Sequence, residues 1–173
     1  MSELTLPDVD FSYTKIFVTG LYGTGKSTTA SLIAQSTGHR LLNFDDLWSY
    51  PRAAGPSQNQ HVREHFSKLG DRFVIDAIGF NPRPDLYRTF NSFYSKHEGE
   101  ILIVCTLCLS LEVWMKRLAK KRLVTKINVE NYIDFHTTLL PLHSGKNIIH
   151  YDTVAGTCVE PSDIEEFIRG IQS

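Results

Sequence analysis

The sequence lacks the features that would tie a chain to a membrane, to a disulfide scaffold or, through overall charge, to a polyanion. Its 173 residues carry a formal net charge of -1, so only a local Lys/Arg groove could hold nucleic acid. Three cysteines, an odd number, do not form a disulfide framework. The longest apolar run, Ile101–Leu109, is about half as long as a membrane-spanning helix. These absences predict one globular domain without a membrane partner.

Two of the cysteines form a CxxC, a spacing that elsewhere marks zinc or redox sites. Cys105 and Cys108 lie inside the apolar run, where an odd separation along a strand directs them to opposite faces. No second Cys/His pair has zinc-ligand spacing. We therefore expect buried structural thiols and a reducing, cytoplasmic setting. Residues 1–13 are acidic and contain Pro7, so no signal peptide is expected.

Short β-rich segments recur along the chain and alternate with segments of helical spacing. Each strand candidate is a near-continuous apolar run, which is typical of strands buried on both faces of a parallel sheet. The expected strands are Lys15–Thr19, Arg40–Phe44, Arg72–Asp76, Glu100–Leu107 and Asn147–Tyr151. The expected helices are Lys26–Ser36, Gln58–Leu69, Arg83–His97, Ser110–Arg122, Asn128–Leu140 and Ser162–Ile171. This alternation predicts an α/β fold, a doubly wound sandwich around a five-stranded parallel sheet.

The last expected helix carries its own start signal and an apolar face. A candidate capping box, Ser162-x-x-Glu165, opens it. The face that it should bury consists of Ile164, Phe167, Ile168 and Ile171.

The strongest motif is a glycine-rich loop between the first strand and the first helix. Residues 20–27, GLYGTGKS, match GxxxxGK[ST] in full, in the expected strand-loop-helix context. Glycines allow a tight turn whose N–H groups, with the helix N-terminus, face a phosphate. Lys26 is expected between the β- and γ-phosphates, and the Ser27 hydroxyl on Mg²⁺. The expected nucleotide-binding residues are Gly20, Tyr22, Gly23, Thr24, Gly25, Lys26, Ser27 and Thr28.

The loop motif alone could belong to a kinase, a GTPase or a motor ATPase. GTPases carry DxxG and NKxD motifs, but the segment from Asp71 to Val74 lacks the first and the chain lacks the second. Motor ATPases need subdomains for which 173 residues leave no room. We therefore predict an ATP- and Mg²⁺-dependent kinase that transfers the γ-phosphate to a hydroxyl group, with ATP taken over GTP by default.

Carboxylates follow the second and third strands, at the edge where α/β sheets bind ligands. Asp45 is the candidate base or acceptor-positioning group, and its neighbour Asp46 is the better helix cap. Asp76 ends the third strand and is a candidate for binding the acceptor or, with Ser27, Mg²⁺. Either Asp45 or Asp76 could instead be a turn or cap residue.

The fourth expected helix ends in a cluster of cations that could contact the transferring phosphoryl group or face solvent. The cluster consists of Lys116, Arg117, Lys120, Lys121 and Arg122. Arg117 and Arg122 are the better catalytic candidates, because a guanidinium binds phosphate through paired hydrogen bonds. The single kinase domain, 1–173, is thus expected to have an N-terminal extension at 1–13, an acceptor-side loop at 49–59 and a lid region at 110–128.

At these residues the chain resembles the phage polynucleotide 5′-kinase branch of the P-loop kinases. The resemblance runs from Lys15 to about Leu142. Beyond the phosphate loop it rests on residues 44–46 (FDD), 74–82 (VIDAIGFNP) and 111–122.

The resemblance implies a strand order and a set of roles. The order is 2-3-1-4-5, Asp45 is the general base, Asp76 lies near the acceptor, and Arg117 or Arg122 lies at the γ-phosphate. Three residues after the base, where that family often has arginine, this chain has Trp48, whose ring could bind substrate by stacking on a base.

Three readings of the function stay open at this point. The first is a kinase acting on DNA or RNA, at a polynucleotide 5′-hydroxyl or at the hydroxymethyl group of a modified pyrimidine. The second is a small-molecule kinase, for a nucleoside, a nucleotide or a metabolite of the shikimate or gluconate type. The third is a nucleotide switch without phosphate transfer. Nothing in the sequence predicts an oligomeric state.

Overall fold

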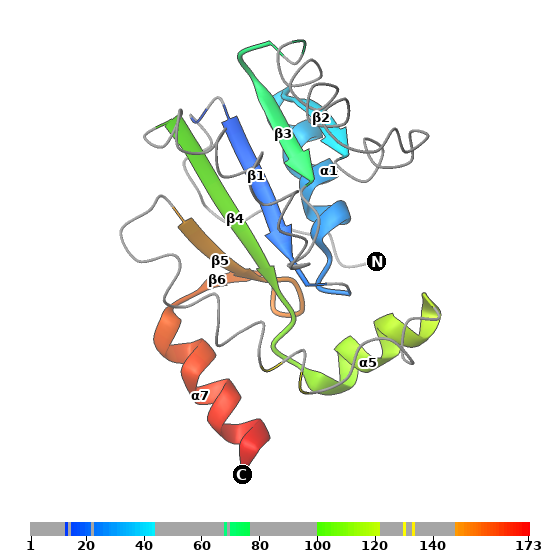
Figure 1. The fold of residues 1–173 in the computed structure, drawn as a ribbon, viewed down its shortest axis with the longest axis vertical. Coiled ribbons are helices and arrows are strands. Elements are labelled where there is room, and N and C mark those ends of the chain that lie inside the picture. Colours follow the sequence, from blue (N-terminus) through cyan, green and yellow to red (C-terminus); the bar gives the residue numbers. More distant parts are fainter. Residues whose placement is uncertain are drawn as a thin grey trace, which may run out of the picture.

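The computed structural model describes residues 13, 15–21, 23–43, 68, 70–76, 100–121, 130, 133 and 148–173. These residues form a six-stranded sheet in the order β2-β3-β1-β4-β5-β6, with helices against it (Figure 1). The strands are β1 Lys15–Gly20, β2 Arg40–Asn43, β3 Phe73–Asp76, β4 Ile101–Leu107, β5 Ile148–Asp152 and β6 Thr157–Val159. The helices with described bounds are α1 Lys26–Thr37, α5 Leu111–Lys120 and α7 Pro161–Gln172.

Five of the strands are parallel and follow the expected order, with boundaries within one or two residues of the predictions. The expectation of a purely parallel, five-stranded sheet is wrong, because β6 adds an antiparallel edge in which Tyr151 of β5 pairs with Cys158. A turn joins β5 and β6, with the Gly156 N–H donating to the Asp152 carbonyl at 2.8 Å. Gly156 has a φ of 71°, a conformation that glycine adopts without strain.

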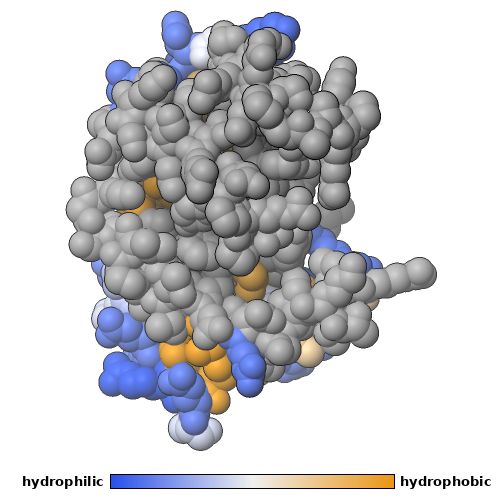
Figure 2. All heavy atoms as spheres, viewed as in Figure 1, coloured by the Kyte–Doolittle hydropathy of each residue, from blue (hydrophilic) through white to orange (hydrophobic). Residues whose placement is uncertain are grey.

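The sheet separates two apolar clusters, as a doubly wound fold requires. Alternate side chains of β4 serve opposite faces: Leu102 and Val104 pack with α1, whereas Cys105 and Leu107 pack with α5 and α7. All seven residues of β4 are buried, which explains why its sequence is a continuous apolar run. In Figure 2, hydrophilic atoms lie over the outer side of α7, beside an apolar strip.

The cysteines of the CxxC are fully buried thiols that form no disulfide, as expected. Their predicted placement on opposite faces is wrong: Cys105 and Cys108 share one apolar cluster. Cys108 follows the last residue of β4, so the alternation of the strand no longer applies to it. Burial raises the pKa of both thiols.

Helix α7 begins earlier than expected and with different capping residues. Glu160 and Asp163 form the capping box, with Pro161 in the first turn, so the assignment of Ser162 and Glu165 is wrong. Its apolar face is confirmed, because Ile164 is buried and packs with the cluster under α5.

Several predicted segments lie wholly or almost wholly outside the described residues. They are the helices at 58–69, 83–97 and 128–140, the N-terminal extension and the loop at 49–59. None of the described helices combines the length and the apolar content that crossing a bilayer demands.

Candidate functional site

The glycine-rich loop joins the carboxyl end of β1 to the start of α1, at the centre of the sheet (Figure 1). Gly23 and Gly25 have φ values of 80° and 85°, in the left-handed region that favours glycine. Gly20 is needed for space: a Cβ there would lie 2.6 Å from Thr24 Oγ1 and 2.9 Å from the Thr106 carbonyl oxygen. The motif therefore requires glycine at positions 23 and 25 for the backbone conformation, and at position 20 for the close packing of neighbouring atoms.

The side chain of Thr24 supports the loop from below. It is fully buried, and its hydroxyl lies 2.6 Å from the Leu21 carbonyl oxygen and 2.9 Å from the Thr106 hydroxyl. Thr106 on β4 in turn donates to the Thr19 carbonyl at 3.1 Å. Two hydroxyls thus fix the loop to β4, and what Thr24 can offer a phosphate is its backbone.

The first turn of α1 presents the motif's polar side chains. Lys26 is 9% exposed, whereas Ser27 and Thr28 are exposed to solvent. Gly25 is the N-cap residue and has no side chain to occupy the helix N-terminus. The N–H groups of the helix N-terminus and Lys26 thus belong to the same first turn, and both suit a phosphate. Tyr22, the remaining motif residue predicted to bind nucleotide, lies outside the described residues.

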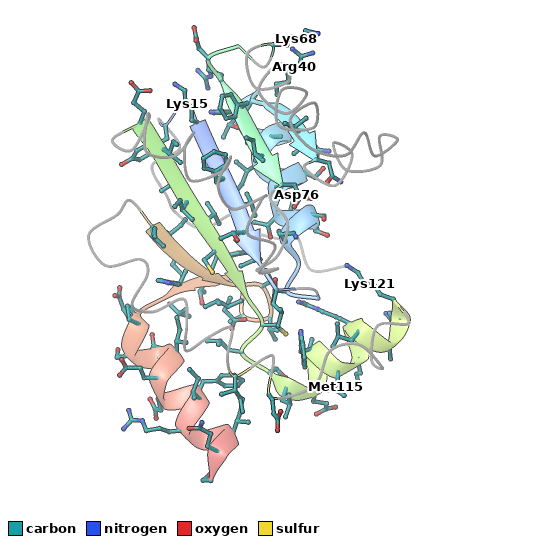
Figure 3. All side chains as sticks on the ribbon, viewed as in Figure 1. Lys15, Arg40, Lys68, Asp76, Met115 and Lys121 are labelled. Atoms are coloured by element: carbon teal, nitrogen blue, oxygen red, sulfur yellow. The ribbon has the colours of Figure 1, made fainter. Side chains whose placement is uncertain are left out.

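One side of the loop is bordered by β3 and β2. Asp76 ends β3, is 5% exposed, and lies in register with Val18 of β1 and Asn43 of β2. Its carboxylate therefore sits near the carboxyl end of the strand that leads into the phosphate loop (Figure 3). The other residues predicted for this side, Asp45 and Trp48, lie outside the described residues.

The oxygen donors around the loop suit Mg²⁺ rather than a softer metal. Ser27 offers a hydroxyl and Asp76 a carboxylate, both hard ligands of the kind that Mg²⁺ uses beside substrate phosphates. Among the described residues, no group of three His, Cys, Asp or Glu side chains could hold a metal ion without further ligands. A cation at this loop would thus depend on the phosphates themselves for part of its coordination.

The other side of the loop is bordered by α5 and the end of β5. Arg117 is half-buried, and its Nη1 donates to Thr153 Oγ1 at 2.8 Å and to the Gly23 carbonyl at 3.3 Å. Arg117 therefore contacts the outer side of the phosphate loop. Arg122, the second predicted arginine, lies outside the described residues.

A cleft of about 330 Å³ opens between α1, α5 and the end of β5. Its lining residues are Gly23, Gly25, Thr28, Thr29, Arg117, Lys120, Lys121 and Thr153. The charged residues among them are all cations, and Figure 3 shows one of them, Lys121, at the end of α5. The cleft thus favours an anionic ligand in contact with the phosphate loop.

Lys116 belongs to the predicted cation cluster but is directed elsewhere. Its ammonium group lies 2.7 Å from the Glu112 carboxylate one turn earlier on α5, and both side chains are exposed. The hydrogen bond and the charge of Lys116 lower the pKa of Glu112. Of the described cations in the cluster, Arg117, Lys120 and Lys121 line the cleft.

The sequence reasoning missed the last residue of β5 and the residue that follows it. Asp152 is buried, and its Oδ1 accepts hydrogen bonds from the N–H groups of Leu109 and Val154, at 3.2 and 3.1 Å. Thr153 contacts both the phosphate loop and Arg117. The available signal was an Asp directly after an apolar strand, the same signal that singled out Asp76.

Two solved structures resemble this chain over nearly its whole length. A shikimate kinase from Bacteroides thetaiotaomicron is 18% identical, with a TM-score of 0.51 over 93% of this chain and 97% of that one. A sugar kinase from Janibacter sp. is 17% identical, with a TM-score of 0.52 over 92% of this chain and 93% of that one. No protein-family model matches the sequence, and no curated protein matches it. The likeness shows that this chain shares the fold of these two kinases.

Proposed function

We propose that the protein is an ATP-dependent kinase that phosphorylates a hydroxyl group of a small molecule. The observation that carries the proposal is the phosphate loop itself. Its left-handed glycines and the buried Lys26 lie at the start of α1, between a carboxylate on one side and a cation-lined cleft on the other. No GTPase motif in the sequence competes with this reading.

ATP and the acceptor bind on opposite sides of the loop. The cleft beside Arg117 and Thr153 takes ATP, because it adjoins the phosphate loop and its cations attract the negatively charged phosphates. The acceptor then approaches from the β2–β3 side, where Asp76 lies. The γ-phosphate lies between them, at Lys26 and the amides of the loop.

The transfer exchanges one P–O bond for another. The acceptor oxygen bonds to the γ-phosphorus, the bond from that phosphorus to the bridging oxygen breaks, and ADP leaves with the electron pair. The acceptor's hydroxyl proton goes to a carboxylate, for which Asp45 is our candidate. Lys26 stabilises charge on the phosphoryl oxygens, as would Arg122. Ser27 and Asp76 would hold Mg²⁺, which would neutralise charge on the phosphates.

We propose a small-molecule acceptor, whereas the residue pattern of the sequence favours a nucleic acid. Both solved structures described above carry the names of small-molecule kinases, shikimate kinase and sugar kinase. Neither is a polynucleotide kinase, so the resemblance to the phage branch gains no support from them. The net charge of -1 also offers no broad basic surface for a polynucleotide.

The test is transfer of labelled γ-phosphate from ATP and Mg²⁺ to a panel of acceptors. The panel contains polyol acids and sugars, nucleosides and nucleotides, 5′-hydroxyl DNA and RNA, and DNA with 5-hydroxymethyl pyrimidines. We expect label in a small molecule, abolished by Lys26→Ala and unaffected by Lys116→Ala, whose ammonium is paired with Glu112 on the exposed side of α5. Label in a polymer would replace this proposal by the nucleic-acid reading.

Binding measurements separate the roles that turnover alone would merge. Asp45→Asn should abolish transfer and leave ATP affinity intact, because Asp45 is proposed to act on the acceptor. Ser27→Ala should reduce the gain in ATP affinity that Mg²⁺ gives the unaltered protein. ATP binding without transfer to any acceptor, in every variant, would favour the nucleotide switch.

A further inference from the structure

Thr153 occupies a junction of four segments, and its hydroxyl is the centre of that junction. Thr153 Oγ1 lies 2.7 Å from the Thr24 carbonyl oxygen, 3.1 Å from the Leu107 carbonyl oxygen and 2.8 Å from Arg117 Nη1. It is 8% exposed, so water does not compete freely for these partners. The phosphate loop, β4, α5 and the end of β5 therefore meet at one oxygen atom.

The proton of this hydroxyl has a preferred acceptor. A hydroxyl has one proton to donate and can accept, so it accepts from the Arg117 guanidinium and donates to one carbonyl. The Leu107 carbonyl already accepts from the Thr153 backbone N–H at 3.0 Å. The shorter distance is to Thr24, so the proton is directed to the phosphate loop.

Holding the Thr24 carbonyl fixes the direction of the next amide. In a trans peptide plane the C=O of Thr24 and the N–H of Gly25 point in opposite directions. A carbonyl that is turned outward to Thr153 therefore turns the Gly25 N–H inward, where the loop faces a phosphate. The Thr153 side chain also abuts Gly25 directly, since a Cβ on Gly25 would lie 3.1 Å from Thr153 Cγ2.

We infer that Thr153 is a positioning residue for phosphate binding, which acts by holding the Thr24 carbonyl outward and by joining the phosphate loop to Arg117 on the cleft. The inference rests on the proposed function, because it assumes that the loop binds the phosphates of ATP. It adds a residue from the far side of β4 to a site otherwise built from the loop motif.

The test compares two ligands and three variants by calorimetry. The ligands are ATP with Mg²⁺ and inorganic tripolyphosphate with Mg²⁺, which has the phosphate chain without the nucleoside. Thr153→Val replaces the hydroxyl by a methyl group of similar size, and Thr153→Ser keeps the hydroxyl. Thr157→Val is the matched control, since Thr157 is exposed on β6 only a few residues further on.

We expect Thr153→Val to weaken both ligands by roughly tenfold, the loss typical of one hydrogen bond to a group that must stay oriented. Thr153→Ser should restore both affinities to within about twofold, and Thr157→Val should change neither. Unliganded thermal unfolding shows whether each variant is folded, and Thr153→Ala replaces Thr153→Val if the latter is not. A threonine that only stabilises the fold would lower the thermal unfolding midpoint of Thr153→Val and leave both affinities unchanged.

Three results would overturn the inference while leaving the proposed function in place. Unchanged affinity of Thr153→Val for both ligands would remove Thr153 from binding. Weakening for ATP alone would place its action at the nucleoside end. Thr153→Ser as weak as Thr153→Val would make the methyl packing, and not the hydroxyl, responsible. Failure of the unaltered protein to bind either ligand would instead overturn the proposed function, and this inference with it.

Discussion

At the scale of single residues, the left-handed glycines of this chain do two different things. Gly25 and Gly38 both have positive φ values, 85° and 71°, and they stand at the two ends of α1. A Cβ on Gly25 would lie 3.1 Å from Thr153, whereas nothing lies within 4 Å of a Cβ on Gly38. A substitution at either position would therefore strain the backbone, but only a substitution at Gly25 would also crowd the site.

The pair gives a matched prediction. Gly38→Ala should lower the free energy of unfolding by about 1 kcal/mol, through strain alone, and leave ATP affinity unchanged. Gly25→Ala should cost at least as much stability and should also abolish ATP binding, because it displaces Thr153 and blocks the helix N-terminus. Urea unfolding and calorimetric titration measure the two effects. Equal ATP affinity in the two variants would show that Gly25 is needed only for its backbone conformation.

At the scale of elements, α5 packs against the phosphate loop as well as carrying the cations of the cleft. Trp114 and Leu118 are fully buried, and they lie 3.4 and 3.2 Å from the position of a Cβ on Gly23. The helix starts at a Ser110 cap, which accepts from the Val113 N–H at 3.3 Å. The packing of α5 thereby limits how far the loop can move toward the cleft.

Removing a buried side chain of α5 should allow the phosphate loop to move more freely. We expect Leu118→Ala to cost about 2–4 kcal/mol of stability, the usual range for a buried leucine, and to weaken ATP binding as well. Lys116→Ala, on the exposed side of the same helix, should change neither the unfolding midpoint nor the affinity. Full ATP affinity in a folded Leu118→Ala protein would show that the loop holds its shape without α5.

At the start of α7, the sequence prediction and the structure assign different capping residues. Glu160 is the N-cap residue of the helix, and the Asp163 carboxylate accepts from the Glu160 N–H at 2.9 Å. Asp163→Ala should therefore lower stability by about 1 kcal/mol, whereas Ser162→Ala should leave it unchanged. Chemical denaturation of the two variants decides between the caps. The reverse ranking would restore Ser162, which the sequence pattern alone favours.

At the scale of the whole molecule, the predictable part of the fold is the part set by burial on both faces. Strands such as β4 are apolar throughout because both faces are covered, and that pattern is readable without coordinates. β6 was not predictable, because three residues, two of them exposed, leave no periodicity to detect. The start of α7 was misplaced because Ser162-x-x-Glu165 and Glu160-x-x-Asp163 compete as caps, and only the backbone decides.

The candidate site shows the same division. A contiguous motif such as residues 20–27 is readable because one local turn creates its function. Thr153 was missed because its partners, Thr24, Leu107 and Arg117, are distant in sequence and are brought together only by the order of the strands. The roles of Asp45, Trp48 and Arg122 stay predictions, since these residues lie outside the described part of the chain.

A buried histidine on β5, next to the edge strand, predicts how the stability of the protein depends on pH. His150 of β5 is 9% exposed and lies in register with Cys105 of β4 and Val159 of β6. Burial lowers the pKa of its imidazole, and the charge of Glu160 opposes part of that shift. In the unfolded chain the imidazole regains its ordinary pKa, so it binds a proton that the native state does not, and acid favours unfolding.

We therefore expect the free energy of unfolding to fall as the pH decreases through the ordinary histidine pKa of 6.5. The contribution of His150 is fully present above that pH and is lost below it, because the native imidazole stays neutral while the unfolded one becomes charged. His150→Asn removes this group and keeps the other histidines, so the difference between the two pH profiles belongs to His150. Urea unfolding at pH values from about 5.5 to 7.5 measures both profiles. Parallel profiles would mean that His150 binds its proton equally well in the folded and unfolded chain, against what its burial requires.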